Sequence, residues 1–334
     1  MNRPTEKYAV QERLWGRTAQ EKIRAARVVV FGVGGTGSAH AEALARAGVG
    51  TLVLVDRDVV EYGDLHRNRL YDEEDARRAT PKALAVAARL RAINADVSVE
   101  PIVAFADAAN AVALAAAADA LVDGSDNFAL RWVLNDVAVA TGRPLIYQGA
   151  LGAVAAAMAV IPRAGPCLGC IAVDGGDERT CADVGVSPAL VAAVGAWGAT
   201  LTLATVRGDG ANVAGWLYRF EDTGAIAAVR VGRDPSCERC GLGRFGAAEP
   251  SLPTTATRVC GGGAWEIWPA ARRRLDLAAV ASRLAADYGV AREGPTLQVE
   301  GEGLTGIFFE DGRALIYGAG DSAAARRWYE RCVG

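Results

Sequence analysis

Histidine and lysine are scarce in this chain of 334 residues. The two histidines are His40 and His66, so catalysis by a histidine pair, or a metal site with several histidine ligands, is not expected. Only three of the 36 basic residues are lysines, namely Lys7, Lys22 and Lys82. Because arginine serves elsewhere, a lysine that faces a pocket is more significant here than in an average chain.

The chain also lacks an excess of positive charge. Its net charge is −3, which argues against a nucleic-acid scaffold or a basic membrane-surface protein. The longest weakly polar run that we identify, residues 149–162, is shorter than the ~20 apolar residues of a membrane span and predicts a buried strand. The first 16 residues, "MNRPTEKYAVQERLWG", lack the apolar core of a signal peptide. We therefore expect a cytoplasmic protein with no nucleic-acid or membrane partner.

Seven cysteines do not form an even set of disulfides. Four of them form two C-x-x-C pairs, "CLGC" at 167–170 and "CERC" at 237–240. In a cytosolic chain this spacing favours a metal over disulfides. Two thiolate pairs brought together give a closed tetrahedral zinc site, which leaves no open position for catalysis. The predicted zinc ligands are Cys167, Cys170, Cys237 and Cys240.

Strand and helix patterns alternate along the first half of the chain. The apolar run "RVVVFG", a glycine turn, a helix and the run "TLVLVD" form one βαβ unit over 27–56. Further alternation predicts an α/β fold with a doubly wound, Rossmann-like, mostly parallel sheet. Other helices are expected over 5–25, 81–94, 107–118, 129–142 and 187–206.

The chain changes character after the predicted sheet. Loops and cysteine pairs dominate 163–250, which also holds a hairpin turning at 222–224. After a linker at 246–258, the last segment reads as strand, helix, three short strands and helix. The expected domains are a doubly wound α/β domain over 1–162, a zinc and loop region over 163–250 that completes it, and a small α+β domain over 262–334.

The stretch "GVGGTG", residues 32–37, lies between the first strand and the helix that follows it. Glycines allow the backbone to approach a phosphate, and the helix N-terminus adds N–H groups and a positive dipole end. Asp56 ends the next strand, where a carboxylate accepts hydrogen bonds from ribose hydroxyls. By itself the pattern leaves three interpretations open: a nicotinamide dinucleotide, ATP, or a tight turn without a ligand.

The residues after Asp56 favour ATP. Arg67 and Arg69 follow in "LVDRDVVEYGDLHRNRLY", and guanidinium groups neutralise a triphosphate. Lys82 at the next helix start adds a point charge. Asp126 follows a strand end in "VDGSDNFALRWVLND", where a carboxylate that faces phosphates is a plausible magnesium ligand. Each arginine taken singly also fits a solvated surface charge.

Together these motifs resemble the ThiF/MoeB/HesA family of ubiquitin-activating-enzyme-like adenylyltransferases. The resemblance covers roughly residues 7–245 and runs "GVGGTG", "LVDRDVVEYGDLHRNRLY", "PK", "VDGSDNFALRWVLND", "PCLGC", "TCADVGVSP" and "CERC" in order. It implies ATP- and magnesium-dependent adenylylation of the C-terminal carboxylate of a small ubiquitin-like sulfur-carrier protein ending in Gly-Gly. Thiocarboxylate formation for thiazole, molybdopterin or a similar product would follow, with a sulfur donor such as a cysteine desulfurase or rhodanese.

The resemblance also assigns roles to individual residues. Magnesium would be held by Asp126, the triphosphate by Arg67 and Lys82, and the ribose by Asp56. The remaining nucleotide contacts would come from the same motifs, at Gly32, Gly34, Gly35, Gly37, Asp58, Asp64 and Asn127.

Two positions depart from the family pattern. The family commonly donates an arginine from the N-terminal segment to the ATP of the partner in a homodimer, but Val10 occupies that position here. Arg13, one helical turn later, is the candidate replacement. The family's Asn and Gln are Asp64 and Asn68 here, and a carboxylate at position 64 would repel phosphate unless it shares the metal.

Cys181 lies in the Gly- and Asp-rich loop "GGDERTCADVGVSP". The resemblance implies a part in sulfur transfer, and an unused loop thiol is the alternative. Cys260 and Cys332 are expected to be ordinary thiols. Two rival functions stay open: an NAD-dependent oxidoreductase, and a non-catalytic partner that only binds a ubiquitin-like protein.

Overall fold

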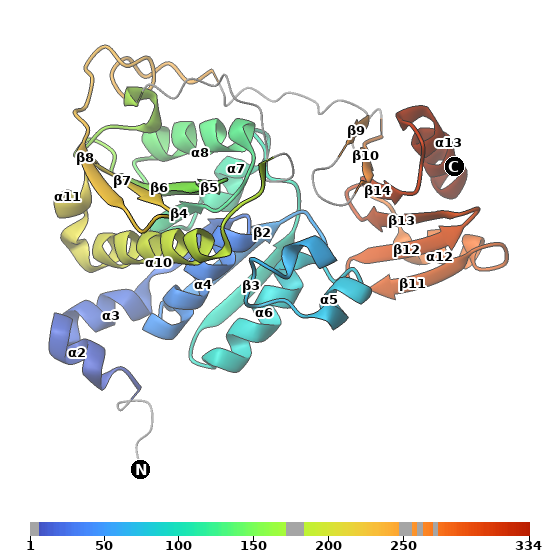
Figure 1. The fold of residues 1–334 in the computed structure, drawn as a ribbon, viewed down its shortest axis with the longest axis horizontal. Coiled ribbons are helices and arrows are strands. Elements are labelled where there is room, and N and C mark those ends of the chain that lie inside the picture. The colour runs from blue at the N-terminus through green and yellow to red at the C-terminus, as the bar shows by residue number, and fades with distance from the viewer. Residues whose placement is uncertain (1–6, 172–183, 247–255, 259–262, 270–272) are drawn as a thin grey trace. The chain divides into compact units, whose positions relative to one another are not determined.

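The computed structural model describes residues 7–171, 184–246, 256–258, 263–269 and 273–334. The chain divides into two compact units, one of residues 1–76 and 82–250 and the other of residues 77–81 and 251–334. Each unit has its own sheet (Figure 1).

An eight-stranded sheet forms the centre of the first unit, in the order β3-β2-β1-β4-β5-β6-β7-β8. The pairs from β3 to β5 are parallel, and β5 to β8 are antiparallel, which confirms the predicted doubly wound, mostly parallel sheet. The strands are β1 (Arg27–Phe31), β2 (Thr51–Asp56), β3 (Ser98–Val103), β4 (Ala120–Asp123), β5 (Leu145–Leu151), β6 (Val154–Val160), β7 (Trp216–Glu221) and β8 (Ile226–Arg230).

Helices cover both faces of this sheet because alternate strand residues point to opposite sides. In β1, Val28 and Val30 pack in one core with α4, α6 and α10, whereas Val29 and Phe31 pack in a second core with α7 and α8. The described helical elements are α2 (Ala9–Trp15), α3 (Arg17–Ala25), α4 (Gly35–Ala47), η1 (Tyr62–Asp64), α5 (Glu73–Arg77), α6 (Lys82–Ile93), α7 (Ala111–Ala115), α8 (Phe128–Thr141), η2 (Leu168–Cys170), α10 (Pro188–Ala204), η3 (Thr205–Asp209) and α11 (Gly210–Val213).

Three sequence expectations for this unit were wrong. The N-terminal helix is split by Gly16, whose φ of 83° interrupts the helical backbone. The alanine-rich helix extends only over Ala111–Ala115, because the turn at 107–110 precedes it. The helical stretch Pro188–Val213 is, contrary to expectation, long and apolar enough to cross a membrane, but 56% of its most apolar window is buried. Its side chains Val194 and Leu201 pack in the core beneath the sheet.

The second unit contains a six-stranded sheet in the order β11-β12-β13-β14-β10-β9, antiparallel throughout. Four strands, not three, separate its two helices, and β9 lies within the expected linker. Trp328 and Phe308 are central to its core. Its elements are β9 (Ala256–Arg258), β10 (Trp265–Ile267), α12 (Leu277–Leu284), β11 (Gly289–Glu293), β12 (Thr296–Gly301), β13 (Leu304–Phe309), β14 (Ala314–Tyr317) and α13 (Ser322–Val333).

Candidate active site

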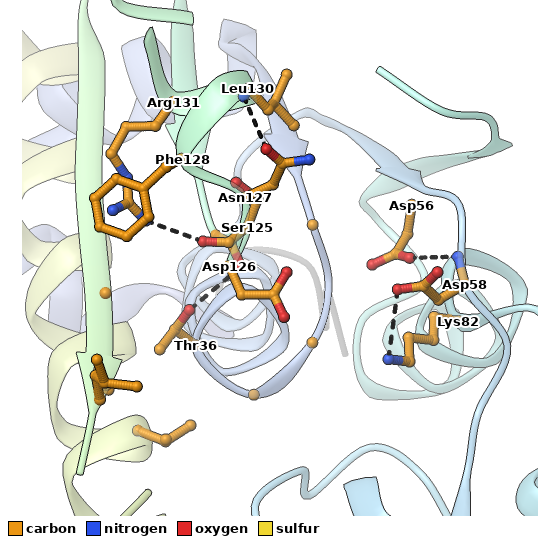
Figure 2. Close-up of a pocket in the computed structure, with 18 of the residues that line it drawn as sticks. Thr36, Asp56, Asp58, Lys82, Ser125, Asp126, Asn127, Phe128, Leu130 and Arg131 are labelled. Carbon is orange, nitrogen blue, oxygen red and sulfur yellow. Dashed lines mark hydrogen bonds and ion pairs between the residues drawn. The ribbon is translucent and has the colours of Figure 1, made fainter. Parts of the chain in front are cut away.

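A pocket of about 450 Å³ opens where parallel strands β1, β2 and β4 end (Figure 2). β1 pairs with β2 on one side and β4 on the other, so the crossover connections leave in opposite directions here. Ligands of doubly wound sheets bind at such a point. The pocket brings together ten of the eleven residues predicted to bind the nucleotide, namely Gly32, Gly34, Gly35, Asp56, Asp58, Asp64, Arg67, Lys82, Asp126 and Asn127.

Gly37, the eleventh, serves backbone packing next to this pocket. A Cβ on Gly124 would lie 2.6 Å from the Gly32 carbonyl oxygen and 2.7 Å from the Gly37 Cα, so these three backbones touch. Gly32 also has φ 81°, which favours glycine. By contrast, a Cβ on Gly34 would meet no atom of the described chain within 4 Å. Gly32 and Gly37 therefore shape the turn, and Gly34 keeps the loop surface open.

Three side chains hold the glycine loop from the β2 side. The Asp56 carboxylate accepts a hydrogen bond from the Val33 N–H at 2.7 Å, and the Tyr71 hydroxyl donates to the Val33 carbonyl at 2.7 Å. The Asn68 amide donates to the Gly34 carbonyl at 3.2 Å. Sequence reasoning missed Tyr71 and gave Asn68 no role, although both lie in the quoted motif after β2.

Asp56 is buried at the end of β2 (Figure 2). Burial raises the pKa of Asp56 to about 6, and the neighbouring Asp58 adds to the shift, while Lys82 and the N–H groups of Val33 and Asp58 oppose it. A carboxylate held this way presents an acceptor edge at the strand end, where a ribose is expected.

Asp64 forms two ion pairs with the predicted triphosphate ligands. Its carboxylate lies 3.2 Å from the Lys82 Nζ and 2.8 Å from an Arg67 guanidinium nitrogen. Asp64 is therefore neutralised by the protein itself, a possibility that sequence analysis did not consider when it weighed repulsion against a shared metal.

Lys82 is the lysine that faces the pocket. Burial alone would lower the pKa of Lys82, but the carboxylates of Asp58, Asp64, Asp56 and Asp126 raise it above its ordinary value. Lys82 therefore keeps its positive charge at neutral pH.

Asp126 lies in the loop between β4 and α8 and is exposed within the pocket. Figure 2 shows its carboxylate pointing into the space that separates it from Asp56, Asp58 and Lys82. Asn127 caps α8 by accepting a hydrogen bond from the Leu130 N–H at 3.1 Å. An exposed carboxylate facing a glycine loop and two cations suits a hard cation that accompanies a phosphate.

Other charged candidates do not reach the pocket. Arg69 pairs with Glu42 on the surface at 2.9 Å and does not line this pocket. Arg13 is exposed on α2 and is likewise absent from the described pocket lining.

Cys181 lies outside the described residues. His40 is fully buried between Gln148 and Thr202, and burial lowers the pKa of His40 to about 4, so it is a neutral core residue.

Sequence analysis also missed Arg131 and Tyr147, which line the pocket. Arg131, in the second turn of α8, pairs with the fully buried Asp123 at 2.8 Å. The only sequence signal was the spacing of an aspartate at the strand end and an arginine eight residues later.

The four predicted zinc ligands form a cluster, which packs in the core that includes α8. Their sulfur atoms all lie within 4.8 Å of one another, with Cys167 and Cys237 3.7 Å apart and Cys170 and Cys240 3.3 Å apart. Tetrahedral zinc with bonds of ~2.3 Å separates its sulfurs by about 3.8 Å, so the cluster fits such an ion. Burial raises the pKa of three of the thiols, those of Cys167, Cys170 and Cys240.

The family model described as the ThiF family matches residues 8–239 of this sequence. The chain belongs to the ThiF family. Within it, the sequence is 34% identical over 326 residues to the sulfur carrier protein ThiS adenylyltransferase of Bacillus subtilis, covering 96% of each chain. It is 37% identical to the SAMP-activating enzyme E1 of Haloferax volcanii, over 68% of this chain and 85% of that protein.

A third relative in this family is the molybdopterin-synthase adenylyltransferase of Escherichia coli, 32% identical over 66% of this chain and 90% of that protein. Among solved structures, E. coli MccB with MccA-N7isoASN superposes with a TM-score of 0.64 at 23% identity, covering 72% of this chain and 75% of that one. That similarity supports the shared fold alone.

Proposed function

We propose that this protein adenylylates the C-terminal glycine carboxylate of a small ubiquitin-like sulfur-carrier protein that ends in Gly-Gly. One observation carries the proposal: a single pocket is lined by the glycine loop, Lys82, Arg67 and Asp126. Both relatives are named as adenylyltransferases, one of them of a sulfur carrier protein, and these names support this reaction class over a nicotinamide oxidoreductase.

The reaction needs positioning and charge neutralisation more than proton transfer. A carrier carboxylate oxygen attacks the α-phosphorus of ATP, a new P–O bond forms, and the bond to the pyrophosphate oxygen breaks. Because the carboxylate is already a nucleophile, no general base is required. The glycine loop, Lys82 and Arg67 hold and neutralise the phosphates, and Asp56 orients the ribose.

We assign two metals to the chain. Magnesium fits Asp126, because its carboxylate is a hard oxygen ligand beside the predicted phosphate position, and the ion would neutralise the leaving pyrophosphate. Zinc fits the four-cysteine cluster, whose sulfurs have tetrahedral spacing. With four protein ligands, the zinc ion would stabilise the loops and take no part in the reaction.

The sulfur step follows adenylylation in this proposal. The Cys181 thiolate would attack the acyl carbon of the adenylate, forming a C–S bond as AMP leaves with its oxygen. The persulfide of a donor such as a cysteine desulfurase or rhodanese would then displace the Cys181 thiolate from the acyl carbon. A thiol reductant would cleave the resulting S–S bond and release the thiocarboxylate. The reaction would take place in the cytoplasm.

We further propose a homodimer in which Arg13 of one subunit neutralises the ATP phosphates bound by the other. We also propose that the chain divides into an adenylation domain over 1–162, a crossover and zinc region over 163–250, and a C-terminal domain over 262–334. The exposure of Arg13 on α2, away from its own chain's pocket, supports action on a second subunit.

Carrier-dependent exchange of labelled pyrophosphate into ATP tests the function directly. We expect exchange with a ThiS-type carrier ending in Gly-Gly, and none when the last glycine is deleted. Absence of exchange while the protein binds the carrier would favour the non-catalytic partner. Calorimetric binding of NAD⁺ in preference to ATP would favour the oxidoreductase.

A further inference from the structure

The loop that carries Asp126 is attached to the fold through Arg131. The Arg131 Nε donates to the Asp123 carboxylate at 2.8 Å, and a second guanidinium nitrogen donates to the Ser125 carbonyl at 3.2 Å. Asp123 also accepts hydrogen bonds from the Ser125 hydroxyl at 2.7 Å and the Ser125 N–H at 3.1 Å. Asp123, Ser125 and Arg131 are therefore joined to one another by hydrogen bonds in a closed polar ring, and Ser125 directly precedes Asp126.

Two aromatic rings lie against the Arg131 guanidinium. Its central carbon lies 4.6 Å from the centroid of the Phe128 ring and 4.7 Å from that of the Tyr147 ring. Tyr147 is on β5, so the guanidinium connects the first turns of α8 to the neighbouring strand. Stacking and two directed hydrogen bonds are properties of a planar guanidinium that an ammonium group does not reproduce.

The residues on both sides of Asp126 are fixed, while its own carboxylate is exposed. Ser125 belongs to the polar ring, and Asn127 caps α8 through the Leu130 N–H. The Thr36 hydroxyl and the Gly124 carbonyl, 3.5 Å apart, connect this loop to the glycine loop. The carboxylate position relative to the phosphate-binding loop therefore depends on the ring.

We infer that Arg131 is a positioning residue, which sets the place of Asp126 through Asp123 and Ser125 and so determines the affinity of the pocket for a divalent cation. The inference rests on the proposed function, since it assigns the cation to Asp126. Arg131 acts through its neighbours and needs no contact with the nucleotide.

The test measures the Mg²⁺ concentration that gives half-maximal ATP–pyrophosphate exchange with a ThiS-type carrier. Arg131→Lys keeps the charge beside Asp123 but loses the fork and the stacking. We expect the half-saturating Mg²⁺ concentration to rise about tenfold, as for other partners that orient a metal ligand. ATP binding in EDTA should stay within about twofold, because the glycine loop is unchanged. A purely structural role would lower the folded fraction without moving the Mg²⁺ midpoint.

Ser125→Ala provides a milder variant that leaves the Arg131–Asp123 pair intact. We expect the Mg²⁺ midpoint to rise about threefold and the melting temperature to fall by only a few degrees, because Asp123 keeps its other hydrogen bonds. The matched control is Arg143→Lys, because the Arg143 guanidinium donates to the carbonyl oxygens of Ala116 and Ala118 outside the pocket. Its Mg²⁺ midpoint should equal that of the unmodified protein.

Chemical rescue separates geometry from charge. In Arg131→Ala, millimolar methylguanidinium should restore the Mg²⁺ midpoint, and methylammonium should not. If the unmodified protein exchanges pyrophosphate but both Arg131→Lys and Ser125→Ala keep its midpoint, the inference is wrong. If Arg131→Lys does not fold, Ser125→Ala decides alone. Absence of exchange in the unmodified protein overturns the proposed function instead.

Discussion

Helix α8 contributes one residue to each of two similar arginine–aspartate pairs, and the two pairs hold different regions of the molecule. Near its N-terminus, Arg131 pairs with Asp123 and stacks on Phe128 and Tyr147. Further along, Asp136 pairs at 2.8 Å with Arg239, which lies between two cysteines of the cluster.

The second pair differs from the first in what it holds. Arg239 stacks on Trp132 at 4.2 Å, and Asn135 accepts a hydrogen bond from the Leu168 N–H at 2.9 Å, so α8 holds the loops of the cysteine cluster. Arg131 instead holds a loop whose next residue, Asp126, is exposed in a pocket. The same type of ion pair therefore holds a pocket loop near the start of α8 and the loops of the cysteine cluster further along.

The comparison predicts its largest effect at Asp126, which is exposed in the pocket. Asp126→Ala should lower carrier-dependent pyrophosphate exchange by more than about 10³-fold, because an electrostatic contact to the reacting phosphates is lost. The melting temperature should change little, since the side chain is exposed. Asp123 is buried and paired with Arg131, so it is not a replacement ligand. Near-normal exchange in this variant would separate the metal from Asp126.

A substitution in the cysteine cluster should instead have its main effect on stability. Cys237→Ser should remove zinc and lower the free energy of unfolding by several kcal/mol, because a structural metal couples its binding to folding. Elemental analysis and chemical denaturation measure both quantities; about one zinc per chain is expected before the change. A chain purified without chelator that holds no zinc would contradict the assignment.

Arg13 does not line the described pocket of its own chain, so its predicted effect acts on the pocket of a second subunit. Arg13→Ala should lower the exchange rate about 100-fold without changing the dimer seen by sedimentation. A mixed dimer of Arg13→Ala and Asp126→Ala chains should regain one working site, because the intact Asp126 then meets the partner's intact arginine. A verified mixed dimer without activity would exclude Arg13 from action across the subunits.

A milder change should sharpen the contrast between the two pairs. Arg239→Lys keeps the charge beside Asp136 but loses stacking on Trp132, so we expect a loss of about 1–2 kcal/mol in unfolding free energy. The Mg²⁺ midpoint of exchange should not move. A shifted midpoint would mean that the cysteine side of α8 also controls the pocket.

The smallest predicted effect is a pH dependence set by two buried groups. His40 has a folded pKa of about 4, below its ordinary 6.5, so its contribution to stability is lost as pH falls from 6.5 to 4. Asp56 has a folded pKa of about 6, above its ordinary 3.8, so its contribution is lost as pH rises through 6. The two trends oppose each other between about pH 4 and 6.

Removing one group should therefore reveal the other. In Asp56→Asn, unfolding free energy should rise with pH between 4 and 6.5, with a slope approaching about 1 kcal/mol per pH unit. The unmodified chain should have a flatter profile in the same window. Urea denaturation at half-unit pH steps measures both, and equal slopes would contradict the opposition.

Local sequence patterns predicted much of the fold and the pocket. Valine runs beside the glycine turn define β1 and β2, and the spacing of two cysteine pairs predicted a cluster that the structure brings together. What the sequence did not reveal depends on contacts between distant segments. Arg131 reads as a surface charge in a helix until Asp123 and Tyr147, which come from two strands, surround it.

The apolar character of α10 was also underestimated from the sequence, because this helix contains many small residues. Helix α10 contains glycine, alanine and threonine among its larger side chains, so its core position follows from close packing: a Cβ on Gly195 would lie 2.7 Å from that of Ala39. Conversely, the alanines of 107–118 favour a helix, but the turn at Asp107–Asn110 leaves only five helical residues.

The ion pairs of Asp64 have a consequence for which form of the nucleotide the protein prefers. Four carboxylates line the pocket, those of Asp56, Asp58, Asp64 and Asp126, together with four cations, Arg57, Arg67, Lys82 and Arg131. Because Arg131 is already paired with Asp123, three cations remain to face the four carboxylates. A bare tetra-anionic nucleotide would compete with Asp64 for the lysine and the arginine. A nucleotide already paired with a divalent ion brings its own compensating charge, so we expect the pocket to bind this form in preference to free ATP.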